Sequence, residues 1–376
     1  MPDILLRMAE DLGATDVVIY LIDFAQTTLE PIPGRGAHPE VFQPEDVATT
    51  MAGRAFVDQR VVCADRGEGD RMWVPIVEGS NRTGVLALTV PAATEAIIGA
   101  CTELGLLAGY LIGTLARATD VFDRYRRRRA MSLAASMQWD LLPPLVLKTA
   151  RLVVAGLVEP AYEVGGDCFD YAIDDATLNL SVIDAMGHGV GSALISALAV
   201  GCYRHDRRED RALSVMHARL DACLAEQLQR FSFATGQLVR VDLHSGVMTW
   251  TNAGHPQPLL IRGGRVIREL ECPPTPPWGL QSIQGASAVT VAAEALEPGD
   301  SVLFYTDGVI EARRLDGELF GVEHLADLVG QHASDHLEPE EIVRRLVRSV
   351  LAHQTGDLTD DATLVLVQWK GPSPRG

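Results

Sequence analysis

The first part of the chain, about 120 residues long, alternates short apolar runs with stretches of helical spacing. The apolar runs are bounded by polar turns, which predicts strands. Strands are expected at 17–22, 28–30, 60–62, 72–77 and 84–90, and helices at 4–12, 45–57 and 95–120. This order predicts an antiparallel sheet with helices on one side.

The longer second part shows the same two patterns in another order. Strands are expected at 152–159, 177–183, 233–243, 247–252, 258–262, 265–270, 287–293, 301–305 and 364–369, and helices at 190–204, 211–230, 322–333 and 338–353. Because strands come in runs and helices come in pairs, the pattern favours an α+β fold.

A charged helix is predicted between the two parts, over residues 119–142, and Pro143 with Pro144 ends it. Its apolar residues recur every three to four positions, which is typical of a helix that pairs with its twin in a homodimer. We therefore expect a domain at 1–118, a connecting helix at 119–144 and a second domain at 145–370.

Net charge is unevenly distributed over the 376 residues. Its total is −18, with 14 Lys and Arg against 19 Asp and Glu in residues 1–150, and 18 against 31 in residues 151–376. The acidic second half argues against nucleic acid as its main partner. An acidic surface instead suits a site that collects divalent cations.

Two features bear on the location of the protein. The six cysteines form no CxxC pair, which favours reduced thiols in the cytoplasm over disulfides or a zinc site. Residues 96–116 are apolar enough to imitate a membrane span, and arginines follow them. Because Glu103 interrupts this segment, we expect a buried or dimer-forming helix, with a membrane span as the lesser alternative.

Acidic residues stand beside glycine or threonine at four places where strands end: Asp167, Asp184, Asp307 and the pair Asp360-Asp361. A single aspartate in such a place is most often a turn residue or a helix cap. Carboxylates brought together would repel one another, and a hard divalent ion is the usual remedy. An all-oxygen set favours Mg²⁺ or Mn²⁺ over zinc, which prefers histidine and cysteine.

Five ordered motifs carry the resemblance to a known family. They are GGDCFD at 165–170, DAMGHG at 184–189, NAGHPQPLL at 252–260, YTDGVIEAR at 305–313 and DDATLVLV at 360–367. In this order they closely resemble the sporulation-protein-E (SpoIIE) type of PPM metal-dependent serine/threonine protein phosphatases. The resemblance implies that residues 145–370 form an α/β sandwich of two central antiparallel sheets flanked by helices.

The resemblance also implies roles for the acids. Asp184 would bridge two metal ions, with the side chain of Asp167 and the backbone carbonyl of Ala185 serving one of them. Asp307 and Asp360 would serve the other ion. A metal-bound water, held by these four aspartates, would be the nucleophile.

Other motif residues receive lesser roles from the resemblance. Asp361 would be a further ligand or a neighbouring acceptor. Asn252, Gly254 and His255 would shape a loop under the site without a chemical step, and His188 would belong to loop structure. No arginine matches the phosphate-binding arginine of the eukaryotic branch.

The first domain resembles a GAF sensory domain in its order of elements. The stretches that carry this likeness are 51–56, the strand at 74–76 and the strand at 84–86. No residue among them identifies a ligand. The resemblance implies a sensing or dimerisation role.

We therefore expect a cytoplasmic, homodimeric phosphatase with two Mn²⁺ or Mg²⁺ ions that acts on phosphoserine or phosphothreonine. The family implies a phosphorylated anti-sigma-factor antagonist as substrate, in partner switching, with gating by the GAF-like domain. One alternative is a catalytically weak binding module or adaptor on the same fold. Another is an unrelated phosphoesterase that acts on small molecules.

Overall fold

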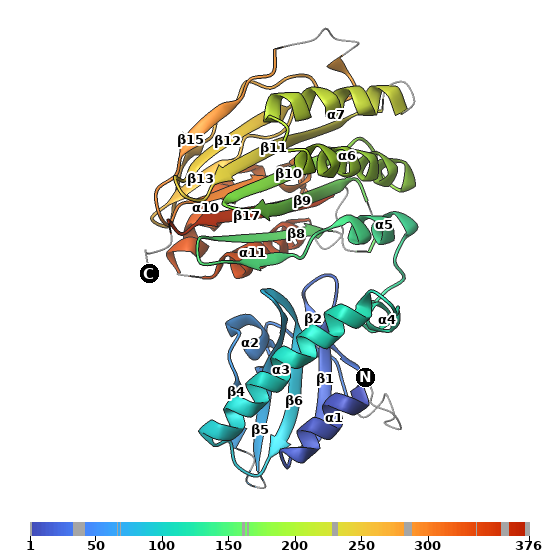
Figure 1. Cartoon of the computed structure of the whole chain (residues 1–376), viewed down its shortest axis with the longest axis vertical. Coiled ribbons are helices and arrows are strands. Elements are labelled where there is room, and N and C mark those ends of the chain that lie inside the picture. Colours follow the sequence, from blue (N-terminus) through green and yellow to red (C-terminus); the bar gives the residue numbers. More distant parts are fainter. Residues whose placement is uncertain are drawn as a thin grey trace. The chain divides into compact units, whose positions relative to one another are not determined.

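A computed structural model describes residues 2–32, 42–65, 67, 69–159, 162–163, 165–227, 232–281, 288–335, 337–354 and 361–372. The chain divides into two compact units, Met1–Ala130 and Met131–Gly376. Each unit is described by itself below (Figure 1). The division falls within the segment predicted to connect two domains.

The first unit contains a six-stranded antiparallel sheet with the order β3-β2-β1-β6-β5-β4. The strands are β1 (Thr15–Ile22), β2 (Thr28–Ile32), β3 (Glu45–Asp46), β4 (Val62–Asp65), β5 (Asp70–Glu78) and β6 (Asn81–Val90). The predicted antiparallel sheet is confirmed. The helix predicted from residue 45 begins only at Met51, because Thr50 caps it by accepting a hydrogen bond from the Gly53 amide.

Helices cover both faces of this sheet. Along β1, Ile19 and Leu21 pack with residues of α1 (Pro2–Asp11) and α3 (Glu95–Ala116). Val18 and Tyr20 point the other way and pack with residues of α2 (Met51–Asp58). The prediction of helices on one side only is therefore wrong, because the alternating side chains of β1 are apolar on both faces.

Two glycines let α3 lie against the sheet at backbone distance. A Cβ on Gly105 would stand 2.5 Å from the Pro75 carbonyl oxygen, and one on Gly109 would stand 1.9 Å from that of Val77. Among the described residues, α3 is the single helix long and apolar enough to cross a membrane. Its glycine side instead packs on β5, whereas Leu106 and Tyr110 on α3 are more than half exposed. The expected burial therefore holds for one side of this helix.

The prediction of a single connecting helix over residues 119–142 is wrong. Residues Val121–Arg126 form α4 and Leu133–Leu141 form α5, with extended backbone at Arg127 between them. Arg126 Nε donates to the Ile22 carbonyl at 2.9 Å, and Arg128 Nη1 donates to Thr28 Oγ1 at 2.8 Å. The arginines thus bind the first unit rather than forming a solvated helix face, and α5 belongs to the second unit.

The second unit holds two antiparallel sheets, as predicted. One has the order β15-β12-β11-β10-β9 and the other the order β14-β13-β16-β17-β8-β7. The strands are β7 (Val146–Lys148), β8 (Leu152–Glu159), β9 (Asp167–Asp174), β10 (Thr177–Ala185), β11 (Ala234–Asp242), β12 (Val247–Ala253), β13 (Leu259–Arg262), β14 (Arg265–Glu269), β15 (Ala292–Ala295), β16 (Ser301–Tyr305) and β17 (Ala362–Trp369). The strand predicted at 287–293 corresponds to β15, and residues 282–287 lie outside the described part.

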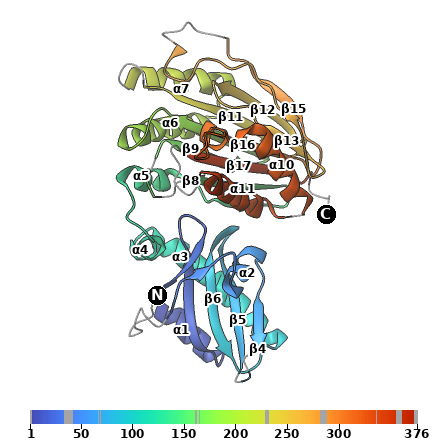
Figure 2. The same ribbon diagram turned by 180° about the vertical axis from the view of Figure 1, so that it is seen from behind.

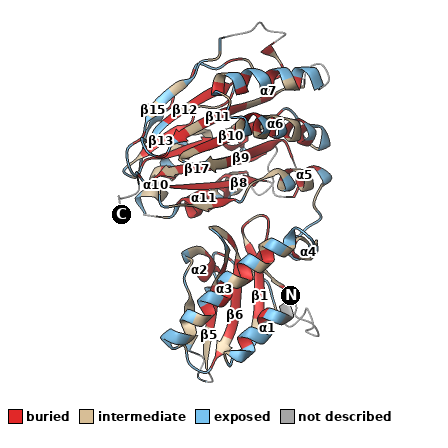
Figure 3. Ribbon diagram, viewed as in Figure 1, coloured by how far each residue is buried: buried red, intermediate tan, exposed pale blue. Residues whose placement is uncertain are grey.

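Helices flank the two sheets on their outer sides. Helices α6 (Val190–Arg208) and α7 (Leu213–Gln227) cover the β9–β12 sheet. Helices α10 (Gly321–Ser334) and α11 (Pro339–His353) cover the other sheet (Figure 2). Most of the strands between them are buried along most of their length, whereas the edge strands β14 and β15 are largely exposed or half-buried (Figure 3).

A disulfide joins Cys202 of α6 to Cys223 of α7. The prediction of reduced thiols is therefore wrong for this pair, because two helices that are separate in sequence pack side by side. Cys63, Cys101, Cys168 and Cys272 are free thiols.

Candidate metal centre

Three polar side chains form a row across neighbouring strands at one end of the sandwich. Asp184 of β10 is the register partner of Asp167 on β9 and of Thr235 on β11. Val182, two residues before Asp184, lies in the core between the sheets, whereas Ile183 packs under α6 and α7. Since side chains alternate along a strand, Asp184 faces the space between the sheets.

Both sheets hold the carboxylate of Asp167. Thr306, directly after β16, donates through Oγ1 to Asp167 Oδ2 at 2.6 Å, and the Thr363 amide of β17 donates to Thr306 Oγ1 at 2.9 Å. Gln138 of α5 donates through Nε2 to the Asp167 carbonyl at 2.5 Å. Asp167 is 2% exposed, so its carboxylate is fixed inside the unit.

The glycine before Asp167 brings three groups together. Asp361 accepts hydrogen bonds through Oδ2 from the Gly166 amide and from the Asp167 amide, the latter at 3.1 Å. A Cβ on Gly166 would stand 2.9 Å from the Ala185 carbonyl oxygen and 3.4 Å from Asp361 Oδ2. Only a residue without a side chain lets the Ala185 carbonyl and the Asp361 carboxylate approach this closely.

Asp307 reaches the same end of the sandwich as the first residue of the short helix α9 (Asp307–Ile310). A Cβ on the next residue, Gly308, would stand 1.9 Å from the Asp361 carbonyl oxygen. This close packing places the Asp307 turn directly against Asp361. Asp360, the remaining predicted ligand, lies outside the described residues.

The electrostatics of the row match a site for a cation. Burial raises the pKa of Asp167 well above its ordinary value, and the negative charges of Asp184 and Asp361 raise it further, against the hydrogen bond from Thr306. Such repulsion is what a hard divalent cation relieves, and the donors are all oxygens. Within the described ranges, no three His, Cys, Asp or Glu side chains gather as a complete metal site.

A hydroxyl and an imidazole stand behind Asp184. Thr235 Oγ1 lies 3.2 Å from Asp184 Oδ2 and 2.9 Å from His255 Nδ1. Burial lowers the pKa of His255 to about 3, with the Tyr305 main chain opposing the shift. His255 is therefore neutral near pH 7. His188 is exposed on the turn between Asp184 and α6.

Asp170, the last residue of the first motif, ties α5 and α6 to β9. Its carboxylate contacts Arg204 Nη2 at 2.7 Å and Arg207 Nη1 at 2.6 Å. Arg204 Nη2 also donates to the Leu141 carbonyl at the end of α5, at 2.6 Å. Burial raises the pKa of the Cys168 thiol, and the negative charge of Asp170 raises it further. The thiol is therefore protonated and unreactive at neutral pH.

Sequence reasoning did not single out several residues that support the site. They are Gln138, Asp170, Thr235 and Thr306. Asp170 and Thr306 stand inside the recognised motifs, so a signal for them was present. Thr235 and Gln138 carry no such signal, because only strand register and helix packing bring them to the acids.

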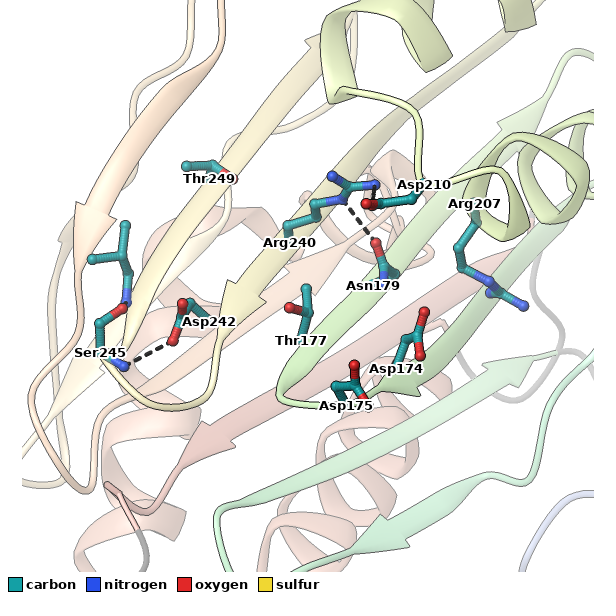
Figure 4. A pocket seen from close by; sticks show the side chains of 11 residues that line it. Asp174, Asp175, Thr177, Asn179, Arg207, Asp210, Arg240, Asp242, Ser245 and Thr249 are labelled. Carbon is teal, nitrogen blue, oxygen red and sulfur yellow. Dashed lines mark hydrogen bonds and ion pairs between the residues drawn. The ribbon is translucent and has the colours of Figure 1, made fainter.

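A separate polar pocket of about 400 Å³ lies at the other end of β10 (Figure 4). Thr177 and Asn179 line it together with Arg240, whose Nε donates to Asn179 Oδ1 at 2.9 Å. Thr177 lies seven residues from Asp184, about 20 Å along an extended strand. This pocket is therefore not part of the acidic site.

Comparison with known proteins finds relatives of the second unit. The sequence profile described as "Stage II sporulation protein E (SpoIIE)" matches residues 174–370. The phosphoserine phosphatase RsbU of Bacillus subtilis (strain 168) is 24% identical over 246 residues, which cover 64% of this chain and 70% of RsbU. The phosphoserine phosphatase RsbP of the same organism is 24% identical over 250 residues, which cover 65% of this chain and 58% of RsbP.

The fold is also found in solved structures, one of which comes from Mycobacterium tuberculosis. The crystal structure of the RsbU and RsbW domains of Rv1364c from Mycobacterium tuberculosis matches with a TM-score of 0.52 and 27% identity. The match covers 60% of this chain and 63% of that chain. The similarity thus spans less than two thirds of RsbP and of the Rv1364c chain.

Proposed function

Because this chain belongs to the stage II sporulation protein E (SpoIIE) family, we propose that it is a metal-dependent protein phosphatase acting on phosphoserine or phosphothreonine. The observation that carries the proposal is the registered pair Asp167 and Asp184, facing the space between the sheets beside Asp361. Two of its relatives are named phosphoserine phosphatases. The proposal assigns the role of nucleophile to no side chain.

The acids divide into two groups of proposed metal ligands. Asp184 would contact both ions, Asp167 and the Ala185 carbonyl one of them, and Asp307 with Asp360 the other. Two Mn²⁺ or Mg²⁺ ions would supply neutralisation of the phosphoryl charge and activation of a water molecule.

The chain's own residues prepare this site. Thr306 holds the Asp167 carboxylate in one orientation, and Asp361 fixes the backbone of residues 166–167. Gly166 keeps the space beside the Ala185 carbonyl free of a side chain. Such fixed donors do not need to reorganise when charge develops on the substrate.

The test is phosphate release by the purified full chain with Mn²⁺ and a phosphoserine-bearing protein substrate. Asp184→Asn should abolish turnover, because it removes the charge shared by both ions. Asp174→Asn is a matched control, since Asp174 is an exposed acid at the far end of β9. Full activity in Asp184→Asn would contradict the mechanism.

The substrate we propose is a phosphorylated anti-sigma-factor antagonist of the partner-switching kind. The support is the similarity to RsbU and RsbP. A phosphorylated antagonist should be dephosphorylated faster than a nucleotide or sugar phosphate at equal concentration. The reverse preference would favour a small-molecule phosphoesterase.

Regulation by the first unit is also part of the proposal. We propose a cytoplasmic homodimer in which a GAF-like sensory unit gates the phosphatase. The contact of Gln138 with the Asp167 carbonyl gives α5 a route to the acids. A chain of residues 131–376 keeps α5 and should keep metal affinity, whereas a chain of residues 145–376 should lose part of it. Equal affinities would argue against α5 as the route.

An adaptor without turnover is the second candidate. Calorimetric titration with Mn²⁺ together with the phosphate assay separates the two candidates. An adaptor would bind its partner protein without releasing phosphate.

A further inference from the structure

The hydroxyl and imidazole behind Asp184 form a continuous hydrogen-bonded chain. Thr235 is the direct register partner of Asp184 on β11. Its Oγ1 lies 3.2 Å from Asp184 Oδ2 and 2.9 Å from His255 Nδ1. One side chain therefore links the acid to the histidine.

The number of hydrogens on the Thr235 hydroxyl limits the direction of these hydrogen bonds. A threonine hydroxyl has one hydrogen, and an ionised carboxylate can only accept. An ionised Asp184 takes the Thr235 hydrogen, and the Thr235 oxygen then accepts from His255 Nδ1. This direction corresponds to the neutral His255 tautomer with its proton on Nδ1, whereas a ring that donated its proton to the Tyr305 main chain would leave Nδ1 to accept from Thr235.

The backbone around His255 is fixed on both sides. Asn252 accepts from the His255 amide through Oδ1 and donates through Nδ2 to the His255 carbonyl, each at 2.8 Å. Gln237 donates through Nε2 to the Pro256 carbonyl, also at 2.8 Å. Gly254 supplies the left-handed turn between them, with φ of +66°. The imidazole is thus held at its place against Thr235.

We propose that Thr235 and His255 are positioning residues that orient the Asp184 carboxylate for a divalent cation. The inference rests on the proposed metal-dependent function. It assigns His255 of the NAGH motif, residues 252–255, a role in orienting Asp184 in addition to shaping a loop. Hydrogen-bonded partners behind a metal-binding side chain fix its orientation and its basicity. Asp167 has the equivalent support from Thr306.

The test measures Mn²⁺ affinity by calorimetry on the full chain. Thr235→Val keeps the branched shape and removes the hydroxyl, and it should weaken binding by about tenfold or more. Thr235→Ser keeps the hydroxyl and should bind nearly as the parent does. Thr251→Val is the matched control, because Thr251 makes the same kind of contact, Oγ1 to His217 Nδ1 at 3.1 Å, on the helix side of the sheet. That control should keep the parent's affinity.

A second measurement does not depend on any variant. Nitrogen NMR of the metal-free full chain should find the His255 proton on Nδ1, and a proton on Nε2 would overturn the assignment. Parent-like Mn²⁺ affinity in Thr235→Val would overturn the positioning role while leaving the proposed function intact. If the parent chain bound no Mn²⁺, both proposals would fail together.

Discussion

Replacing Asp170 by asparagine should destabilise the second unit strongly. Asp170 is 2% exposed, and it contacts Arg204 and Arg207 at 2.7 and 2.6 Å. Removing one partner of a buried ion pair leaves the other charges poorly compensated, which costs about 3–5 kcal/mol. Arg207 is only 12% exposed, so water compensates little of that loss.

The matched control for this change is Asp210→Asn. Asp210 pairs with Arg240 at 3.2 Å in the same unit, but it is 90% exposed. A surface ion pair of this kind contributes about 0–1 kcal/mol. The two variants therefore differ mainly in burial.

Urea unfolding of the full chain, followed by tryptophan fluorescence, measures both variants. Four of the five tryptophans, Trp139, Trp250, Trp278 and Trp369, lie in the second unit and report on it. If Asp170→Asn cost no more free energy of unfolding than Asp210→Asn, the reasoning from burial would be refuted. Loss of the Arg204 link to Leu141 should also loosen α5, which protease sensitivity near residues 131–142 would detect.

Two further predictions concern a glycine and a histidine. Gly308→Ala should lower both the melting temperature and the Mn²⁺ affinity, because its Cβ would stand 1.9 Å from the Asp361 carbonyl oxygen. Gly191→Ala is the control, because a Cβ on this residue of α6 would extend into open space. Equal effects of the two substitutions would contradict the packing argument. Burial lowers the pKa of His217 to about 4. Since the unfolded histidine titrates near 6.5, stability is full above that pH and falls as the pH drops toward 4, by about 2 kcal/mol at pH 5 relative to pH 7. Urea unfolding at both pH values should show a loss in the parent chain that exceeds the loss in His217→Gln by about 2 kcal/mol, because the buried His255 contributes its own loss to both chains. Equal losses in the two chains would contradict this prediction.

Much of the architecture could be predicted from local pattern. The antiparallel sheets and most helices were expected, because period-two and helical spacings reflect which side chains are buried. The connecting helix was not predicted correctly, since its arginines bind Ile22 and Thr28, far away in the sequence. The Cys202–Cys223 pair was missed for the same reason.

The acids illustrate the division between sequence and tertiary structure. The order of the five motifs identified Asp167, Asp184 and Asp307 as candidates, because each stands at a strand end beside glycine or threonine. Strand register alone decided that Asp167 and Asp184 face each other. It also decided that Thr235 and His255 stand behind one acid, because hydrogen bonds between strands join residues that no sequence spacing connects.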